Sequence, residues 1–179
     1  MLTEVEPIIK NIKLHFKIDR NKTHHVLKRS REIQILHPSK VAIYQNFLVY
    51  REKYIYTVFG GSGYINVTKV KTFEDIPPCI TNFCDIFHLS LHQLQPSLGI
   101  DNITASGSLR RKLDLNSLRS AFSQHKFKYN PNSFPGCFVK FKDLGSIIIF
   151  KNGSYSIVGA KCKAHVTQIY QTARNAIQP

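Results

Sequence analysis

The feature that most constrains this chain is an internal duplication with a period of 91 residues. Five pairs of identical or similar residues share that offset and occur in the same order. They are Asn11 with Asn102, Thr23 with Asp114, Leu27 with Leu118, Phe59 with Phe150, and Tyr64 with Tyr155. Chance supplies one or two such pairs, whereas five indicate a structural unit that is present twice. Residues 1–97 and 98–179 are therefore predicted to be two related repeats.

Each repeat is predicted to contain a strand, a helix, a meander of three or four strands and a second helix. In the second repeat, residues 134–161 alternate apolar and polar side chains around the turn-forming residues 151–154. In the first repeat, residues 54–59 and 64–70 have the same character on either side of a glycine-rich turn. The pattern predicts an α+β fold in which the helices cover one face of each sheet, leaving the other face as a candidate binding surface.

Local signals place the helices. Thr23 and Asp114 are predicted N-caps, and Pro77-Pro78 is expected in the first turn of a helix. Residues 95–99 are read as the connection between the repeats. The apolar face predicted after Pro78 contains Ile80, Phe83, Cys84, Phe87 and Leu91, and the closing helix has the stripe Val166, Ile169, Tyr170, Ala173 and Ile177.

The chain is strongly basic. It has 25 Lys and Arg against 11 Asp and Glu, a net charge of +14, and this favours nucleic acid over an anionic membrane or an acidic protein as partner. No apolar run approaches the ~20 residues that span a bilayer, and the acidic N-terminal segment does not resemble a signal peptide. The four cysteines form no CxxC pair and lie among apolar residues, which predicts reduced, mostly buried thiols in an intracellular protein.

Signals for catalysis and for metal binding are weak. His24-His25 and the pair His88/His92 lack the Glu or Cys partners of known zinc motifs. The glycines of residues 60–63 lack the Lys and the following helix of a phosphate-binding loop. The sequence therefore predicts a protein that is not an enzyme and has no metal or cofactor.

A series of short motifs resembles the TATA-box-binding protein family. In the second repeat the matching motifs are Asn102-Ile103, residues 112–115, residues 129–131, residues 134–136, Ile149-Phe150 and residues 159–161. In the first repeat they are Asn11-Ile12, residues 37–40, Val58-Phe59 and Gly63-Tyr64. No single motif is specific for the family. All of them together, at the family's spacing, are specific for it.

The resemblance implies a saddle of two pseudo-symmetric repeats. A curved sheet of ten antiparallel strands would carry four helices on its convex face, with duplex DNA bound on the concave face. In this family, which is a standard example of minor-groove binding, two pairs of Phe side chains wedge between base steps and kink the duplex. The implied function is a monomeric transcription initiation factor that binds and bends A/T-rich promoter DNA in the nucleus, or at the site of viral transcription in an infected cell.

The resemblance assigns roles to individual residues. Phe134 and Phe150 match one wedge pair, and Phe59 matches one member of the other pair. Val41 matches the remaining wedge position, with Phe47 as the alternative if that strand slips in register. Val41 would make one of the two kinks weaker than the other.

Polar residues match the family's remaining DNA contacts. Asn11 and Asn102 match the two asparagines that bond to base edges, whereas Val158 stands where the family has Thr. Asn132-Ser133 replaces an acidic residue that meets transcription factor IIB, so a factor of that kind or RNA polymerase components are expected partners used in an altered way. The residues that match phosphate-contacting positions are Arg51, Lys69, Lys140 and Lys161.

Other functions compete with promoter binding. The same fold could serve as a non-enzymatic interaction module that recruits or sequesters transcription machinery, or as a single-stranded nucleic-acid binder that stacks bases on its aromatic residues. A DNA-repair enzyme of related half-saddle architecture is a more distant alternative, because the sequence has no catalytic constellation.

Overall fold

The computed structural model describes residues 6–32, 45–49, 53–59 and 61–177. Within them, four α-helices and nine β-strands confirm the α+β class. The strands are β1 (Ile8–Ile18), β2 (Gln45–Val49), β3 (Ile55–Phe59), β4 (Tyr64–Val70), β5 (Leu94–Ser108), β6 (Lys126–Lys128), β7 (Gly136–Phe141), β8 (Gly145–Phe150) and β9 (Ser154–Ala160). The helices are α1 (Arg20–Glu32), α2 (Ile76–Phe87), α3 (Leu118–Ala121) and α4 (Lys163–Ile177), and a 3-10 turn, η2, spans Leu91–Gln93.

The hydrogen-bonded order of these strands is β2-β3-β4-β1-β5-β9-β8-β7-β6. The resemblance predicts ten strands, and residues 33–44, just before β2, lie outside the described residues. By contact the chain divides into two compact units. We call residues 11–101 the N-terminal unit, and residues from Asn102 onward with residues 6–10 the C-terminal unit. The boundary expected after residue 97 was inferred from the sequence repeat and not from contacts, so it stays a prediction.

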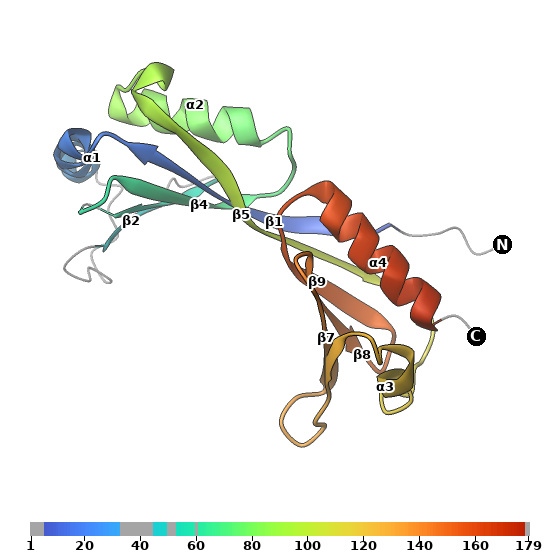
Figure 1. Cartoon of the computed structure of the whole chain (residues 1–179). Helices are drawn as coiled ribbons and strands as arrows, with labels where there is room; N and C mark the ends of the chain where they lie inside the picture. Colours follow the sequence, from blue (N-terminus) through green and yellow to red (C-terminus); the bar gives the residue numbers. More distant parts are fainter. Residues whose placement is uncertain (1–5, 33–44, 50–52, 60, 178–179) are drawn as a thin grey trace. The chain divides into compact units, whose positions relative to one another are not determined.

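The core of the N-terminal unit lies between its strands and α2 (Figure 1). Phe83 of α2 is fully buried, with its ring centroid 5.1 Å from that of Phe16 in β1 and 5.2 Å from that of Tyr56 in β3. The Tyr56 hydroxyl donates a 2.6 Å hydrogen bond to the carbonyl oxygen of Cys79 and so ties the sheet to the helix. Pro at the first positions of α2 confirms the predicted helix start.

The core of the C-terminal unit lies between its strands and the helices α3 and α4. The predicted stripe of α4 is confirmed, since Val166, Ile169, Tyr170, Ala173 and Ile177 are all buried. This helix contacts β8 and β9, and the ring of Tyr170 stacks 5.5 Å from that of Tyr155. Phe122, just after α3, packs edge-on against Phe141 of β7 at 6.4 Å.

The structure corrects the register of the duplication after the first meander turn. The amide of Gly63 donates to the carbonyl oxygen of Phe59, whereas that of Gly153 donates to Phe150, so the first turn is one residue longer. From there the offset is 90 residues: β4 and β9 have the same burial pattern, beginning at Tyr64 and at Ser154. The predicted pairing of Tyr64 with Tyr155 is therefore wrong, because a shift of one residue moves a strand side chain to the opposite face.

Three local predictions are also wrong. Thr23 is not an N-cap, because α1 begins at Arg20 and the Asp19 carboxylate accepts a bond from the Asn21 amide at 2.9 Å. Leu91 is not on the buried face of α2, which ends at Phe87, and its side chain is 60% exposed. Residues 95–99 are part of β5, since sheet pairing overrides their turn-forming composition.

Asp114 begins a turn rather than the helix itself. Its carboxylate accepts a 3.0 Å bond from the Asn116 amide, and α3 begins at Leu118. The apolar side chains that follow Asp114 are nevertheless buried: Leu115, Leu118 and Phe122 all face the core.

Candidate nucleic-acid interface

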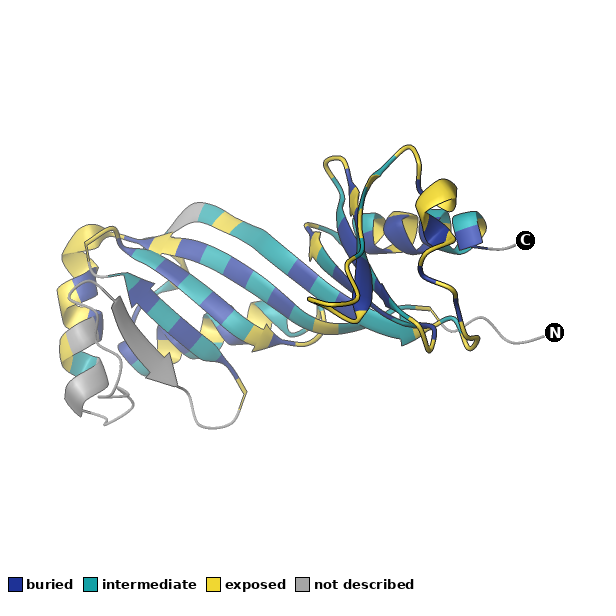
Figure 2. Ribbon diagram, turned by 90° about the horizontal axis from the view of Figure 1, so that it is seen from below, coloured by how far each residue is buried: buried dark blue, intermediate teal, exposed yellow. Residues whose placement is uncertain are grey.

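In each unit one face of the sheet is not buried under helices, and we call it the open face of that unit. Buried residues alternate with half-buried or exposed ones along the strands, as the stripes in Figure 2 show. In the C-terminal unit Val139, Ile147 and Ile157 face the core, and their neighbours lie on the open face. The described open-face residues of that unit include Asn102, Thr104, Ser106, Lys126, Lys128, Gly136, Phe138, Lys140, Ile148, Phe150, Ser154, Ser156 and Val158.

Two of the predicted wedge residues lie side by side. The ring centroids of Phe134 and Phe150 are 5.9 Å apart with an interplanar angle of 57°, and Phe134 is 43% exposed. Gly136, the register partner of Phe150, provides the room for them. A Cβ added to Gly136 would lie 3.0 Å from Cε1 of each ring, tighter than most real contacts, so a larger residue would push the rings apart.

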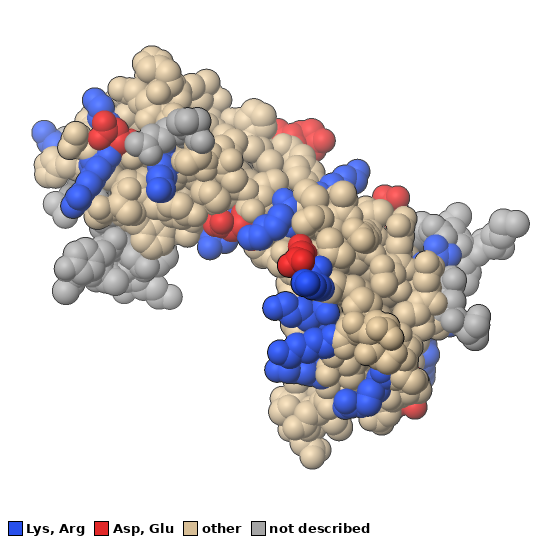
Figure 3. Space-filling view, in the orientation of Figure 1, with Lys and Arg blue, Asp and Glu red and all other residues tan. Residues whose placement is uncertain are grey.

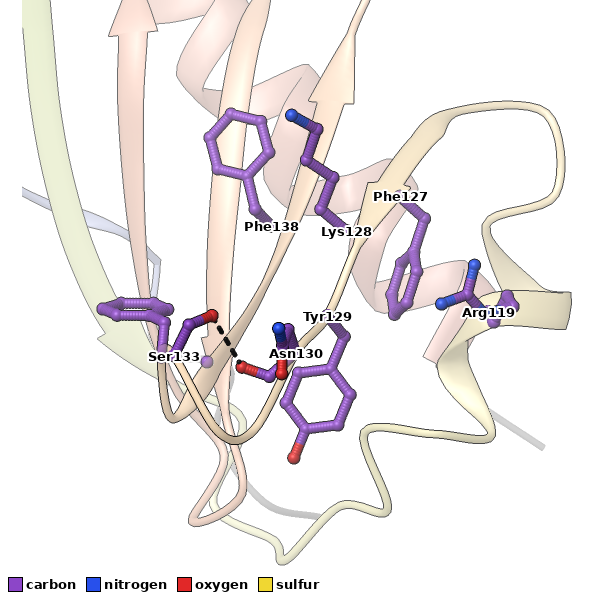
Figure 4. Close-up of a pocket in the computed structure, with 9 residues that line it drawn as sticks. Arg119, Phe127, Lys128, Tyr129, Asn130, Ser133 and Phe138 are labelled. Atoms are coloured by element: carbon purple, nitrogen blue, oxygen red, sulfur yellow. Dashed lines mark hydrogen bonds between the residues drawn. The ribbon is translucent and has the colours of Figure 1, made fainter.

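The loop before β7 holds Phe134 in place. The Phe134 amide donates to the carbonyl oxygen of Asn130 at 3.0 Å, and the Ser133 hydroxyl donates to the same oxygen at 3.1 Å. The loop lies beside a hollow of about 450 Å³ that Arg119 and Phe127 help to line (Figure 4). The Arg119 guanidinium lies 5.2 Å from the centre of the Phe127 ring. A loop bonded to itself in this way presents the exposed ring with little further loss of conformational entropy on binding.

Both predicted base-reading asparagines are held by a bulge in the neighbouring strand. Between β1 and β4 the register shifts from Ile12 to Leu14, and between β5 and β9 it shifts from Ile103 to Ala105. The bulge residues Lys69 and Gly159 have φ angles of 67° and 84°. Their amides donate to the side-chain oxygens of Asn11, at 2.8 Å, and of Asn102, at 2.5 Å.

These bonds determine which end of each asparagine can read a base. Because Oδ1 of Asn102 accepts from the backbone, the amide group projects its two N–H donors. One of them donates to the Thr104 hydroxyl at 3.2 Å. Donors are what the minor groove of an A·T pair requires, since it presents only acceptors there. Sequence alone could assign an asparagine but not its orientation.

Lysines lie opposite one another at the outer strands of the C-terminal unit. Lys140, a predicted phosphate contact, is the register partner of Lys126, and Lys128 pairs with Phe138. Like charges directly opposite in a sheet are destabilising unless an anion neutralises them. In Figure 3, Lys and Arg side chains form a column on the side of this unit away from α3 and α4. Lys126 and Lys128 were missed from the sequence, where the alternation Lys-Phe-Lys is the signal for strand β6.

The structure describes some of the other predicted site residues and leaves two of them undescribed. Phe59, at the end of β3, is half-buried, and its ring packs edge-on against Tyr64 at 6.0 Å. Lys161 is exposed directly after β9, and the corrected offset makes Lys71, also exposed, its counterpart. Val41 and Arg51 lie outside the described residues. The alternative Phe47 is in β2, paired with Thr57.

Replacing Lys69 by glycine is expected to stabilise the protein by about 0.5–1 kcal/mol, because Lys69 has a φ of 67° where its counterpart is Gly159. Urea unfolding would measure this, with Lys71→Gly as a matched control that is expected to bring no gain in stability. If Lys69→Gly does not gain stability in urea, the proposed backbone strain at Lys69 is contradicted.

The same variants also test the predicted contact between Lys69 and a DNA phosphate. A Lys that meets a phosphate lowers the slope of log affinity against log salt by about 1 when it is removed.

Burial lowers the reactivity of the cysteine thiols in the described residues. Burial raises the pKa of Cys79 to about 12 and that of Cys137 to about 11, so both thiols stay protonated. The four cysteines are free, and all but Cys162 are buried, which confirms the prediction for three of them. Among the described residues no three His, Cys, Asp or Glu side chains gather as a metal site, and no helix is long and apolar enough to cross a membrane.

Comparison with known proteins assigns the family. Residues 97–179 match the family described as transcription factor TFIID, or TATA-binding protein (TBP). The chain is similar to TATA-box-binding protein 2 of Methanosarcina acetivorans, at 31% identity over 122 residues, which are 64% of this chain and 65% of that protein. It is 29% identical over 139 residues to the TATA-box-binding protein of Methanothrix thermoacetophila, covering 72% and 75% of the two chains. Residues 97–179 thus belong to the TBP family, and the chain as a whole is similar to archaeal TATA-box-binding proteins.

The solved structure of Methanococcus jannaschii TBP agrees in fold. It superposes with a TM-score of 0.73 at 19% identity, covering 97% of this chain and 98% of that one. This match confirms the predicted TBP fold. The chain spans about 65% of the length of the M. acetivorans relative that it matches. The matched family and relatives are named as TATA-box-binding transcription factors, in agreement with the prediction that the chain is not an enzyme.

Proposed function

We propose that this TBP-family chain binds duplex DNA through its open faces, in the minor groove, and supports transcription initiation at A/T-rich promoters. The single observation that carries the proposal is the Phe134–Phe150 pair. Two rings lie 5.9 Å apart at the end of an open face, one of them 43% exposed and held by a self-bonded loop. Exposed apolar rings next to lysines are costly in a protein with no ligand and useful in one that unstacks bases.

The polar groups of the open faces support the minor groove over the major groove. The side-chain oxygens of Asn11 and Asn102 are already occupied by backbone amides, so each side chain acts as a donor. The minor groove of A·T pairs offers only the acceptors A N3 and T O2, which these donors complement. Flexible pyrimidine–purine steps such as TA unstack at the lowest cost, so a wedge of two rings favours A/T-rich sites.

The two open faces are not equivalent. Val158 of the C-terminal unit has Thr68 as its counterpart in the N-terminal unit, by the 90-residue offset of β4 and β9. A hydroxyl group is therefore present on one face where the other has two methyl groups. We infer that the DNA site is asymmetric. Because Val41 matches a wedge position that the C-terminal unit fills with Phe, we also expect the C-terminal unit to make the stronger kink.

A binding titration with fluorescent duplexes would test the proposal. A TATA-containing duplex and a scrambled duplex of equal composition are compared by anisotropy, and the bend is measured by energy transfer between dyes at the two ends. We expect at least tenfold tighter binding and a larger bend for the TATA duplex. Equal, weak binding to both, abolished at moderate salt, would leave only phosphate attraction and contradict the proposal.

The same titration separates the alternatives. Tighter binding to single strands than to duplex would favour stacking of unpaired bases on the aromatic residues. Binding of transcription machinery that survives loss of the Phe pair would favour a module that recruits or sequesters it. The proposal also includes partners, an oligomeric state and a location. The partners are a factor IIB-like protein or RNA polymerase components, the protein is a monomer on DNA, and its site of action is the nucleus or the site of viral transcription. Fluorescent tagging and pull-down would test these parts.

A further inference from the structure

A histidine and an aspartate from distant strands meet on the open face of the N-terminal unit. Nδ1 of His15, in β1, lies 2.7 Å from Oδ1 of Asp101, in β5. Both side chains are 26% exposed, and Nζ of Lys13 lies 3.8 Å from the second carboxylate oxygen. An ionised carboxylate can only accept a hydrogen bond, so Nδ1 of His15 carries the proton. In neutral His15, Nε2 is then an acceptor.

Two further contacts fix the position of the imidazole ring. It stacks on the Tyr64 ring at 5.1 Å with an interplanar angle of 18°. Its opposite edge lies over Gly99, where an added Cβ would come within 2.6 Å of Cε1 and 2.8 Å of Nε2. A side chain at position 99 would displace the ring. His15 is therefore held by Asp101, Tyr64 and Gly99 in one place and in one tautomer.

An acceptor at this position complements one base pair and not the other. In the minor groove, A·T pairs present only acceptors, whereas a G·C pair adds the N2 amino donor of guanine. We propose that His15, oriented by Asp101 and Gly99, selects bases and admits a G·C pair to the part of the DNA site that the N-terminal unit covers. This inference rests on the proposed minor-groove binding. The inference gives the two units different base preferences. The residue 91 positions after His15 is Ser106, whose hydroxyl both donates and accepts and so does not distinguish the two base pairs.

The charged and titratable groups that contact the ring or its carboxylate partner are Asp101 from β5, Tyr64 from β4 and Lys13 from β1. Burial, and then the Asp101 charge, raise the pKa of Tyr64, so the stacked phenol stays neutral near pH 7. Asp101 is therefore the group that sets the tautomer of His15.

Selection from randomised duplexes tests the inference with the full chain. We expect the wild type to enrich G·C over A·T at one position of the site by roughly three- to tenfold, the effect of one base-edge hydrogen bond. His15→Phe keeps a ring to stack on Tyr64 but has no Nε2, and we expect it to lose the preference.

Asp101→Asn and Lys28→Ala complete the set. An asparagine can donate to Nδ1 and so release the tautomer, which is expected to weaken the G·C preference without removing the ring. Lys28, exposed on α1, is the control and should leave the selected sequences unchanged. Identical selected sequences for the wild type and His15→Phe would overturn the inference while leaving the proposed function intact. Failure of the wild type to enrich any duplex would overturn both.

Discussion

Replacing Phe134 and Phe150 together by alanine is expected to weaken duplex binding by roughly 30- to 1,000-fold and to abolish the bend in the C-terminal half of the site. Contact between an aromatic ring and a base is worth about 1–3 kcal/mol. The two losses overlap because both rings act on one base step, so we expect a total of about 2–4 kcal/mol rather than the full sum. Because the two rings lie 5.9 Å apart and act on one base step, we expect each single variant to show most of the loss of bending. Anisotropy and energy transfer on the same duplex measure both effects.

Controls separate loss of the wedge from loss of the fold. Phe134 is 43% exposed and Phe150 is half-buried, so the double variant is expected to lose at most about 2 kcal/mol of unfolding free energy. Leu91→Ala removes another exposed apolar side chain, 60% exposed in η2, and should leave affinity and bend unchanged. A double variant that binds and bends DNA like the wild type would contradict wedging by these rings.

Phe83→Ala is expected to lower the free energy of unfolding of the N-terminal unit by about 3–5 kcal/mol, the usual cost of removing a fully buried ring. Phe83 has no exposed surface, and its ring contacts Phe16, Tyr56 and Phe87, the last at 4.7 Å. The loss is a large share of the 5–15 kcal/mol that typically stabilises a domain. Hydrogen exchange should therefore show loss of protection first in β1, β3 and β4.

Thr81→Ala is the matched control on the same helix. Thr81 is exposed, so its replacement is expected to change stability by less than about 0.5 kcal/mol. If Phe83→Ala unfolds at the same denaturant concentration as the wild type, the cavity has collapsed without cost and the assigned core is wrong. A fall in protection confined to β7, β8 and β9 would contradict the assignment of Phe83 to the N-terminal unit.

Much of the fold and part of the site followed from local pattern. The stripe of α4 could be predicted because helix periodicity is a short-range signal. The Phe134–Phe150 pair was predicted through the resemblance to the TBP family, whose motifs are also short stretches of sequence. The extent of β5 could not, because Gly99 is turn-forming in isolation and is held in a strand by its neighbours. The counterpart of Lys161 was also missed, since one extra residue in the turn after Phe59 shifts β4 relative to the duplication.

The sequence by itself determined that this chain is basic and α+β, predicted two related repeats, and contained motifs that resemble the TBP family, with aromatic residues at the ends of its meanders. Those properties depend on residue types at fixed spacings along the chain. Only the tertiary structure decided that the Asn102 oxygen is bound by the Gly159 amide and that His15 meets Asp101, 86 residues away. Such orientations depend on which strands the sheet brings together and where it bulges, and no local pattern in the sequence encodes them.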